Sequence, residues 1–273
     1  MALSEVLWGT SNPEKYTDFE KRMIQQFSVL DKKGINYSKA IFEITAEVMP
    51  RPADNGVFYL LKTNQQQNGI HYTTDGTQPT AQSKVYNQPL EITKSQTIKA
   101  VYFENDRPKS NVTEQSFLIH KATSQLVSLQ NQPNGNYAKG GGFTLVDGIQ
   151  GDKAKFGQNW LGFSGTDLNA TIDLGNKQKI SRLGIGLLSS PSSWIYFPKK
   201  VTFEVSEDMI QFETVGTFST EEIQKSKGQI TLDCNKRNIQ FVKVTVENFG
   251  TIPDGQPGAG NKAWLFADEI IVE

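Results

Sequence analysis

Three short stretches in the C-terminal half decide the fold: Ala170-Thr-Ile-Asp-Leu174, Val201-Thr-Phe-Glu-Val205 and Val242-Lys-Val-Thr-Val246. Apolar and polar residues alternate in each stretch, which is the period of a β-strand with one buried face. Long connections rich in glycine separate the stretches. The pattern predicts a jelly-roll β-sandwich over residues 122–273.

Residues 45–121 show the same period in shorter segments. Strands are predicted over 57–61, 69–73, 97–103 and 114–119. The dipeptide Asp75-Gly76 is a strong signal for a two-residue hairpin turn. Several short strands at this spacing predict a small β-sandwich.

The first forty residues have a different pattern. Apolar side chains recur every three or four positions at Tyr16, Phe19, Met23, Phe27 and Leu30. This spacing predicts one amphipathic helix, and Gly34 is a suitable end for it. The apolar run Val6-Leu7-Trp8 before the helix predicts a strand. A single β-α unit cannot bury its own apolar face, so we expect residues 1–44 to be the end of a larger upstream domain.

Composition excludes several classes of protein. The chain has 28 basic and 29 acidic residues, and no window collects Lys and Arg into a stripe, which argues against a nucleic-acid partner. The longest apolar runs are far shorter than the roughly 20 residues that cross a bilayer, so no membrane insertion is expected. Cys234 is the single cysteine, and we expect a plain buried thiol.

Two stretches carry oxygen ligands of the kind that calcium binds: Thr144-Leu-Val-Asp147-Gly148-Ile149-Gln-Gly-Asp152 and Ala267-Asp268-Glu269-Ile270-Ile-Val272. Calcium takes six to eight oxygens from carboxylates and carbonyls. A loop with Asp147, Asp152 and a tight turn at Gly148 can direct several carbonyls to one point, and a carboxylate of the last strand would close the cage. The alternative is that Asp147 only caps a glycine turn.

Aromatic residues in the loops of the C-terminal half are candidates for a sugar platform, because a pyranose face presents C–H groups to a ring. Trp160 and Tyr196 are the favoured pair, whereas Trp194 and Trp264 lie in apolar runs and are expected in the core. Polar residues that could bind sugar hydroxyls in the same loops are Asn159, Asp254 and Gln256.

Motifs in the first two segments resemble one enzyme family. His71-Tyr-Thr-Thr-Asp75-Gly76-Thr-Gln-Pro79-Thr80 resembles the Ig-like domain that follows the catalytic barrel of chitobiase and other β-N-acetylhexosaminidases. Glu5-Val-Leu-Trp8, Phe19, Arg22 and Gly34-Ile-Asn-Tyr37 resemble the last strand and helix of that barrel in glycoside hydrolase family twenty.

The last segment resembles discoidin-type domains, the coagulation-factor C-domain group that includes galactose-binding modules. The resemblance rests on Leu145-Val-Asp147-Gly148, Asn159-Trp160-Leu-Gly162-Phe163 and Trp264-Leu-Phe266. It implies a structural calcium held by carbonyls of Thr144, Ile149 and Asp268 and by carboxylates of Asp147 and Glu269. The family often has Thr at the position of Asp152, so this carboxylate departs from the pattern and adds a ligand.

Together these resemblances imply a mostly β chain in three parts. Residues 1–44 would be the end of a (β/α)8 TIM barrel, 45–121 an Ig-like β-sandwich, and 122–273 a discoidin-type jelly-roll β-sandwich. The chain would contain no catalytic residue, because the adjacent pair Asp268-Glu269 points to opposite faces of a strand and lacks the His-Gly-Gly run of the family's catalytic pair.

The expected function is that of a non-catalytic, carbohydrate-binding region of a β-N-acetylhexosaminidase. Its partners would be a glycan of N-acetylhexosamine or galactose type and the upstream barrel, which would hydrolyse terminal N-acetylhexosamines. The expected location is periplasmic, cell-surface or extracellular, with a signal peptide upstream. The alternative is a structural or protein-interaction module that binds no sugar. Burial of the rings of Trp160 and Tyr196 would favour the alternative.

Overall fold

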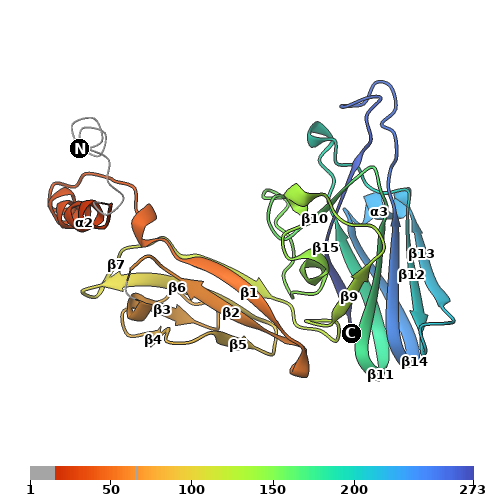
Figure 1. Ribbon diagram of the computed structural model, residues 1–273, viewed down its shortest axis with the longest axis horizontal. Helices are drawn as coiled ribbons and strands as arrows, with labels where there is room; N and C mark the ends of the chain where they lie inside the picture. Colours follow the sequence, from red (N-terminus) through yellow and green to blue (C-terminus); the bar gives the residue numbers. More distant parts are fainter. Residues whose placement is uncertain (1–15, 66) are drawn as a thin grey trace.

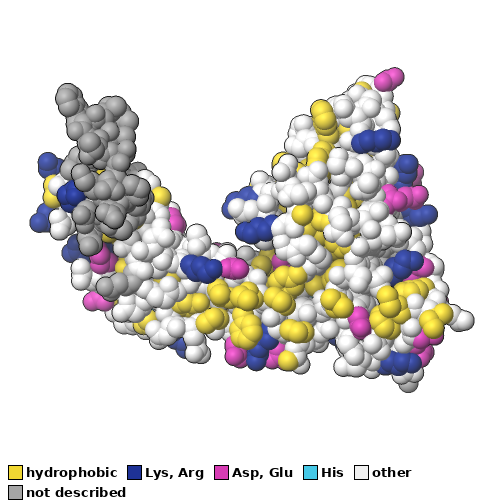
Figure 2. Space-filling model, viewed as in Figure 1, with side chains coloured by type: hydrophobic (Ala, Val, Ile, Leu, Met, Phe, Trp, Pro, Cys, Tyr) yellow, Lys and Arg dark blue, Asp and Glu magenta, His cyan; other side chains and the backbone are white. Residues whose placement is uncertain are grey.

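The computed structural model describes residues 16–65 and 67–273 and shows a mostly β chain with two β-sandwiches in succession (Figure 1). The strand predicted over Val6-Leu7-Trp8 lies outside the described residues. Charged side chains of both signs are interspersed on the face seen in Figure 2. No helix in the described ranges is long and apolar enough to span a membrane.

The predicted amphipathic helix is confirmed as α2 (Tyr16–Lys32). The chain leaves the helix at Gly34, whose φ of 63° favours glycine. Phe27 is 6% exposed and stacks on Tyr37 with ring centroids 4.3 Å apart. Met23, Ile24 and Leu30 pack on the same apolar cluster, so the helix covers one end of the first sandwich.

The first sandwich consists of two antiparallel sheets. One sheet has the order β1-β2-β5, with β1 (Thr45–Arg51), β2 (Gly56–Lys62) and β5 (Leu90–Ile92). The other has the order β4-β3-β6-β7, with β8 also paired to β6; its strands are β3 (Ile70–Thr73), β4 (Lys84–Val85), β6 (Gln96–Glu104), β7 (Arg107–Pro108) and β8 (Thr113–Phe117). Strands predicted over 57–61, 69–73, 97–103 and 114–119 correspond to β2, β3, β6 and β8.

The hairpin predicted at Asp75-Gly76 is wrong. Asp75 Oδ1 accepts hydrogen bonds from Thr77 N (3.0 Å) and Thr77 Oγ1 (2.6 Å), while Gly76 N donates to Thr97 O of β6. The dipeptide is therefore an Asx turn inside a longer loop between β3 and β4. The two-residue hairpin is instead Asn105-Asp106 between β6 and β7, where both φ angles are positive (49° and 60°).

The second sandwich is built on two long strands. The elements are β9 (Leu126–Leu129), β10 (Leu161–Ser164), β11 (Leu168–Leu187), β12 (Lys200–Ser206), β13 (Glu213–Ser219), α3 (Thr220–Lys225), β14 (Gln229–Glu247) and β15 (Trp264–Val272). Short 3-10 helices are η2 (Ala40–Phe42), η3 (Pro52–Asp54), η4 (Gln67–Gly69), η5 (Gly135–Tyr137), η6 (Gly141–Leu145) and η7 (Pro191–Ser193). The three stretches that predicted the jelly roll are confirmed within β11, β12 and β14.

Strands β11 and β14 belong to both layers of this sandwich. Their first and last parts pair with different neighbours: one layer contains β9, β12 and β13, and the other contains β10 and β15. Register irregularities between Asp173 and Arg182 mark the change of layer in β11. The apolar core lies between the layers. Cys234 in β14 is half-buried, not buried as predicted.

A short linker, residues 118–125, joins the sandwiches and is held by both. Ser124 Oγ donates to Gly56 O of the first sandwich and accepts from Arg51 N at 3.0 Å. Ser124 N donates to Val146 O of the second sandwich at 2.8 Å. Ile149 belongs to the second sandwich in sequence, yet it packs in the core of the first. The junction is thus a packed interface and not a free hinge.

Candidate functional site

A cluster of buried acids lies at the junction. Asp147 follows η6, Asp268 and Glu269 are in β15, and His120 comes from the linker. All four residues are buried; Asp268 and Glu269 are 1% and 0% exposed. The sequence reasoning placed the three acids near one another but did not include His120, which lies 149 residues from its partner Glu269.

The carboxylate of Glu269 has one oxygen bound and one orphaned. Oε1 accepts from Gly148 N at 2.9 Å and lies 2.8 Å from His120 Nε2. Oε2 is buried and has no hydrogen-bond partner among the residues that the structure describes. A buried carboxylate oxygen without a partner costs free energy, which a bound cation or proton would recover.

Burial controls the electrostatics of this cluster. It raises the pKa of Glu269 well above the ordinary value, and the same holds for Asp147, where the Glu269 charge adds to the effect. It also raises the pKa of Asp268 to about 6, against backbone hydrogen bonds that lower it. Burial lowers the pKa of His120 to about 4, so its imidazole is neutral at pH 7. The acids are therefore costly to ionise without a cation.

Calcium fits the donors of this cluster in part. The carboxyl of Asp147 and the orphaned oxygen of Glu269 supply oxygens, and Thr144 and Ile149, which flank Asp147 in the chain, are buried. In the described ranges no three His, Cys, Asp or Glu side chains form a group that could hold a metal. A cation here would rely on two carboxylates and on carbonyl oxygens.

Asp152 lies apart from this cluster. Its side chain is 58% exposed, and Oδ1 accepts from Ala154 N at 2.9 Å. Its carbonyl accepts from Trp160 Nε1 at 3.1 Å. The expectation of Asp152 as a sixth ligand is therefore corrected: the aspartate caps a local turn.

Asp268 and Glu269 contact different loops. Asp268 Oδ2 accepts from Gly151 N at 2.9 Å and its Oδ1 accepts from Glu269 N, while Glu269 faces Gly148 and His120. Because both carboxyls are buried, a sugar that binds at the surface does not lie between them.

The favoured sugar platform is corrected. Trp160 is 3% exposed and packs with Leu188, Ile195 and Phe266. Tyr196 is 8% exposed, stacks on Phe249 and donates its hydroxyl to Pro257 O at 2.8 Å. Neither ring presents a face to solvent, because both are buried in small apolar clusters with neighbouring side chains.

Trp194 is instead the exposed ring, which contradicts its predicted place in the core. It is 40% exposed and has a left-handed backbone with φ 62°, which is rare for a bulky residue. The turn that carries it is closed by Ser190 N to Ile195 O (2.9 Å) and Trp194 N to Pro191 O (2.9 Å). Its ring lies on Gly258, where an added Cβ would come within 2.5 Å of Cδ1.

The loop beneath Trp194, residues 250–262, is an ordered hairpin. Ile252 N donates to Asn261 O (2.8 Å), Gly260 N donates to Ile252 O (2.9 Å), and Ala263 N donates to Gly250 O (2.7 Å). Asp254 and Gln256 are exposed in this loop. The loop lies at the same end of the sandwich as the turn that carries η7 (Figure 1). Asn159 is half-buried with φ 55°, in the separate loop before β10.

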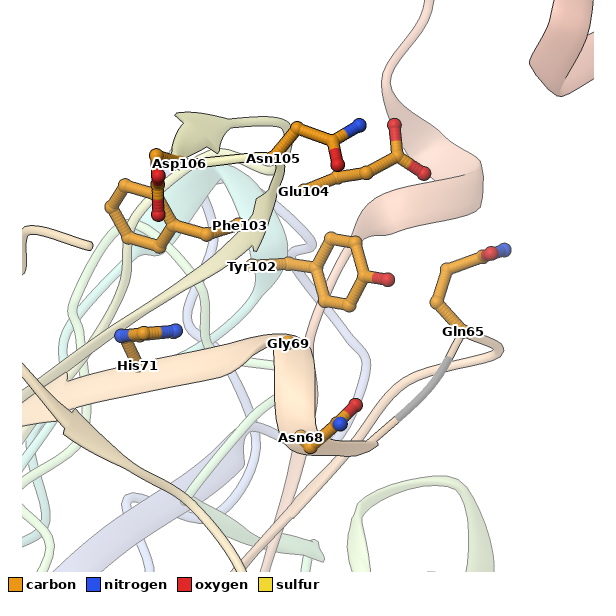
Figure 3. A pocket seen from close by; sticks show the side chains of 9 residues that line it. All are labelled: Gln65, Asn68, Gly69, His71, Tyr102, Phe103, Glu104, Asn105 and Asp106. Atoms are coloured by element: carbon orange, nitrogen blue, oxygen red, sulfur yellow. The ribbon is translucent and has the colours of Figure 1, made fainter.

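A pocket of about 430 Å³ lies on the first sandwich (Figure 3). Amides and acids surround it: Gln65, Asn68, Glu104, Asn105 and Asp106. Its aromatic residues Tyr102 and Phe103 are 5% and 9% exposed, so neither offers an open ring face. His71 Nδ1 lies 3.1 Å from Ser83 O and is thereby tied to the scaffold. Among the residues that the structure describes, the lining of this pocket has no exposed ring comparable to that of Trp194.

One known family model matches part of the first sandwich. The family model described as Fn3 associated matches residues 60–117. No curated protein matches the chain in sequence.

Solved structures similar to the chain include several carbohydrate-binding modules. Chitosan-binding module 1 of a chitosanase/glucanase from Paenibacillus sp. IK-5 is 16% identical, with 56% of this chain and 98% of that chain covered and a TM-score of 0.38. A Clostridium perfringens module in complex with GlcNAc-α-1,4-galactose is 18% identical, with 57% and 94% covered and a TM-score of 0.38. A Streptococcus pneumoniae fucose-binding module is 12% identical, with 62% and 97% covered and a TM-score of 0.39.

Proposed function

We propose that this chain is a non-catalytic, carbohydrate-binding region of a larger glycosidase, and that the sugar lies on Trp194. The exposed ring of Trp194 is the observation that carries the proposal. A tryptophan face binds the C–H face of a pyranose, and polar side chains beside it bind the hydroxyls. Asp254 and Gln256 are exposed in the loop on which the ring rests.

The backbone around Trp194 supports a role beyond packing. A non-glycine residue in the left-handed region costs about 1 kcal/mol or more, and such strain collects at functional sites. Here the strained residue exposes its ring instead of burying it. Hydrogen bonds on both sides fix the turn and the hairpin below it, so a ligand meets a preformed surface.

The proposal includes a structural calcium at the junction. Carboxylates of Asp147 and Glu269 and carbonyls of Thr144, Ile149 and Asp268 would hold it. Bound calcium supplies positive charge that offsets the cost of ionising two buried acids. The orphaned oxygen of Glu269 and the raised pKa values of both acids support the assignment.

The larger glycosidase would be a secreted or cell-surface β-N-acetylhexosaminidase that removes terminal N-acetylhexosamines from glycans. This part of the proposal rests on the sequence motifs quoted above and on α2, which covers the end of the first sandwich as a connecting helix would. Its test is hydrolysis of an aryl N-acetylglucosaminide by the chain extended upstream, with the 273-residue chain as the inactive control.

Titration calorimetry of the chain with N-acetylglucosamine, N-acetylgalactosamine, galactose, fucose and GlcNAc-α-1,4-galactose tests the sugar site. We expect saturable binding of at least one sugar and its loss in Trp194→Ala. Ile210→Ala is the matched control, because Ile210 is also exposed (82%) but lies beyond the opposite end of β12. Binding that survives in Trp194→Ala would contradict the site.

The second candidate is a structural module that binds no sugar. Burial of Trp160 and Tyr196 favours it, because these rings serve the scaffold. In that case every titration would be flat, and removal of the second sandwich would lower the stability of the remaining part through loss of the junction contacts at Ser124 and Ile149.

A further inference from the structure

The linker contributes a side chain directly to the buried acid cluster. His120 Nε2 lies 2.8 Å from Glu269 Oε1, and the two side chains are 1% and 0% exposed. Gly148 N donates to the same oxygen at 2.9 Å. Two donors therefore hold Oε1, and Oε2 is the oxygen left for another partner.

The tautomer of His120 follows from its second nitrogen. Ala122 N donates to His120 Nδ1 at 3.2 Å, so Nδ1 carries a lone pair and no proton. The proton of the neutral ring is then on Nε2, which donates to Glu269 Oε1. A ring fixed at both nitrogens holds the carboxylate in one orientation.

The linker around His120 is in turn hydrogen-bonded to the loop of Asp147 and Gly148 and to the end of β15. Leu118 N donates to Gly148 O at 2.8 Å, and Lys121 N donates to Val272 O at 2.8 Å. An added Cβ at Gly148 would lie 3.2 Å from Leu118 O, so the loop and the linker are in direct contact. Single hydrogen bonds therefore connect the linker directly to Gly148 and to Glu269. A change in the mobility of these two residues would act directly on the linker.

We propose that His120 is a positioning residue for the cation site: its Nε2–H orients the Glu269 carboxylate, and occupancy of the site in return orders linker residues 118–125. This inference rests on the calcium proposed above. Residues that hydrogen-bond to metal ligands fix the ligand geometry, and their loss weakens metal binding about 10- to 100-fold. An ion bound in one domain would thus add to the order of a linker that already packs against both.

Calcium titration of the full chain after chelator treatment is the first test. We expect His120→Ala to bind calcium about tenfold more weakly than the wild-type chain. His120→Gln, whose amide N–H can replace Nε2–H, should restore most of the affinity. His71→Ala is the matched control, because His71 is the other of the 2 histidines and bonds Ser83 O in the first sandwich. Its calcium affinity should equal that of the wild type.

Hydrogen exchange of the linker gives a readout that a packing role alone would not change. Saturating calcium should slow amide exchange in residues 118–125 of the wild-type chain and of His71→Ala, and clearly less in His120→Ala. Thermal unfolding in chelator shows that each variant is folded. If His120→Ala does not fold, His120→Asn takes its place with the same expectation, because its side chain is polar but shorter.

Two outcomes overturn the inference and can be told apart. Equal calcium affinity in the wild type and in His120→Ala overturns the positioning role and leaves the calcium site standing. No calcium binding by the wild-type chain overturns the calcium site and the positioning role together, before any variant is compared.

Discussion

The loop end and the junction of the second sandwich differ in how their candidate side chains meet solvent. At the loop end Trp194 is 40% exposed. Backbone hydrogen bonds fix its turn, and its ring packs on Gly258. At the junction His120, Asp147 and Glu269 are buried and bind one another or the backbone. One end thus exposes an aromatic ring to solvent, and the other buries ionisable side chains inside the protein.

Under the proposed function, this difference would separate recognition from stability. Buried polar groups are costly to leave unpaired, so substitutions at the junction should act on folding. An exposed ring contributes little to folding but can contribute a large contact to a ligand. Residues of the same type should therefore behave differently at the two places.

The largest contrast is expected between two tryptophans. Trp160→Ala should lower the free energy of unfolding by about 4 kcal/mol, because it empties a packed site among Leu188, Ile195 and Phe266. Trp194→Ala should lower it by less than about 1 kcal/mol. Urea unfolding of both variants measures the difference. Similar losses in the two variants would contradict the assignment of Trp194 to recognition.

The next effect is expected at the buried acid. Glu269→Ala should lower the free energy of unfolding by about 3 kcal/mol, because it leaves the N–H groups of Gly148 and His120 without an acceptor. Glu207→Ala is the control, since Glu207 pairs with Lys177 at the surface and should cost about 0.5 kcal/mol or less. Denaturant unfolding of both variants compares them, and equal costs would argue against a special role for the junction.

A comparable effect concerns the loss of folding stability at low pH. The folded chain protonates His120 only near pH 4, against an ordinary value of 6.5, because the imidazole is buried. The unfolded chain takes up this proton first, so stability is retained above pH 6.5 and is lost as the pH falls toward 4. His120→Gln has no titrating group at this position, so it lacks this pH-dependent loss of stability. In chelator, the wild type should lose about 3 kcal/mol more than the variant between pH 7 and pH 4. Parallel pH profiles would contradict the lowered pKa of His120.

The smallest effect uses two glycines of one loop. Gly258 and Gly255 both have positive φ angles (85° and 82°), so alanine costs about 1 kcal/mol at either position. Only at Gly258 does an added Cβ collide with the Trp194 ring, at 2.5 Å from Cδ1, whereas Gly255 faces open space. Gly258→Ala should weaken sugar binding and Gly255→Ala should not. Titration calorimetry of both variants measures this difference. Equal sugar affinities would mean that the ring position does not matter.

Local patterns in the sequence predicted the elements well. Alternation placed β11, β12 and β14, and three- to four-residue spacing placed α2 with its end near Gly34. These signals depend on neighbouring residues only. The turn at Asp75-Gly76 was misjudged because its type depends on which strand lies beside it, and Gly76 bonds to β6.

Contacts between distant segments could not be predicted in the same way. Nothing local in the sequence shows that His120 meets Glu269, or that Ile149 packs in the core of the preceding sandwich. Trp160 is buried and Trp194 is exposed, the reverse of the prediction, for the same reason: burial depends on the distant loops that cover a ring. The short motif Pro191-Ser-Ser193 before Trp194 is a local signal for a tight turn, and it could have indicated an exposed ring.

The most direct test of recognition at the loop end is an NMR titration of the indole N–H signals. The chain has 4 tryptophans, so each indole reports its own site. On addition of the sugar that binds in calorimetry, the account predicts a saturable shift of the Trp194 signal, assigned by its loss in Trp194→Phe, while the buried Trp160 signal stays in place. A shift centred on another tryptophan, with Trp194 unchanged, would contradict the account.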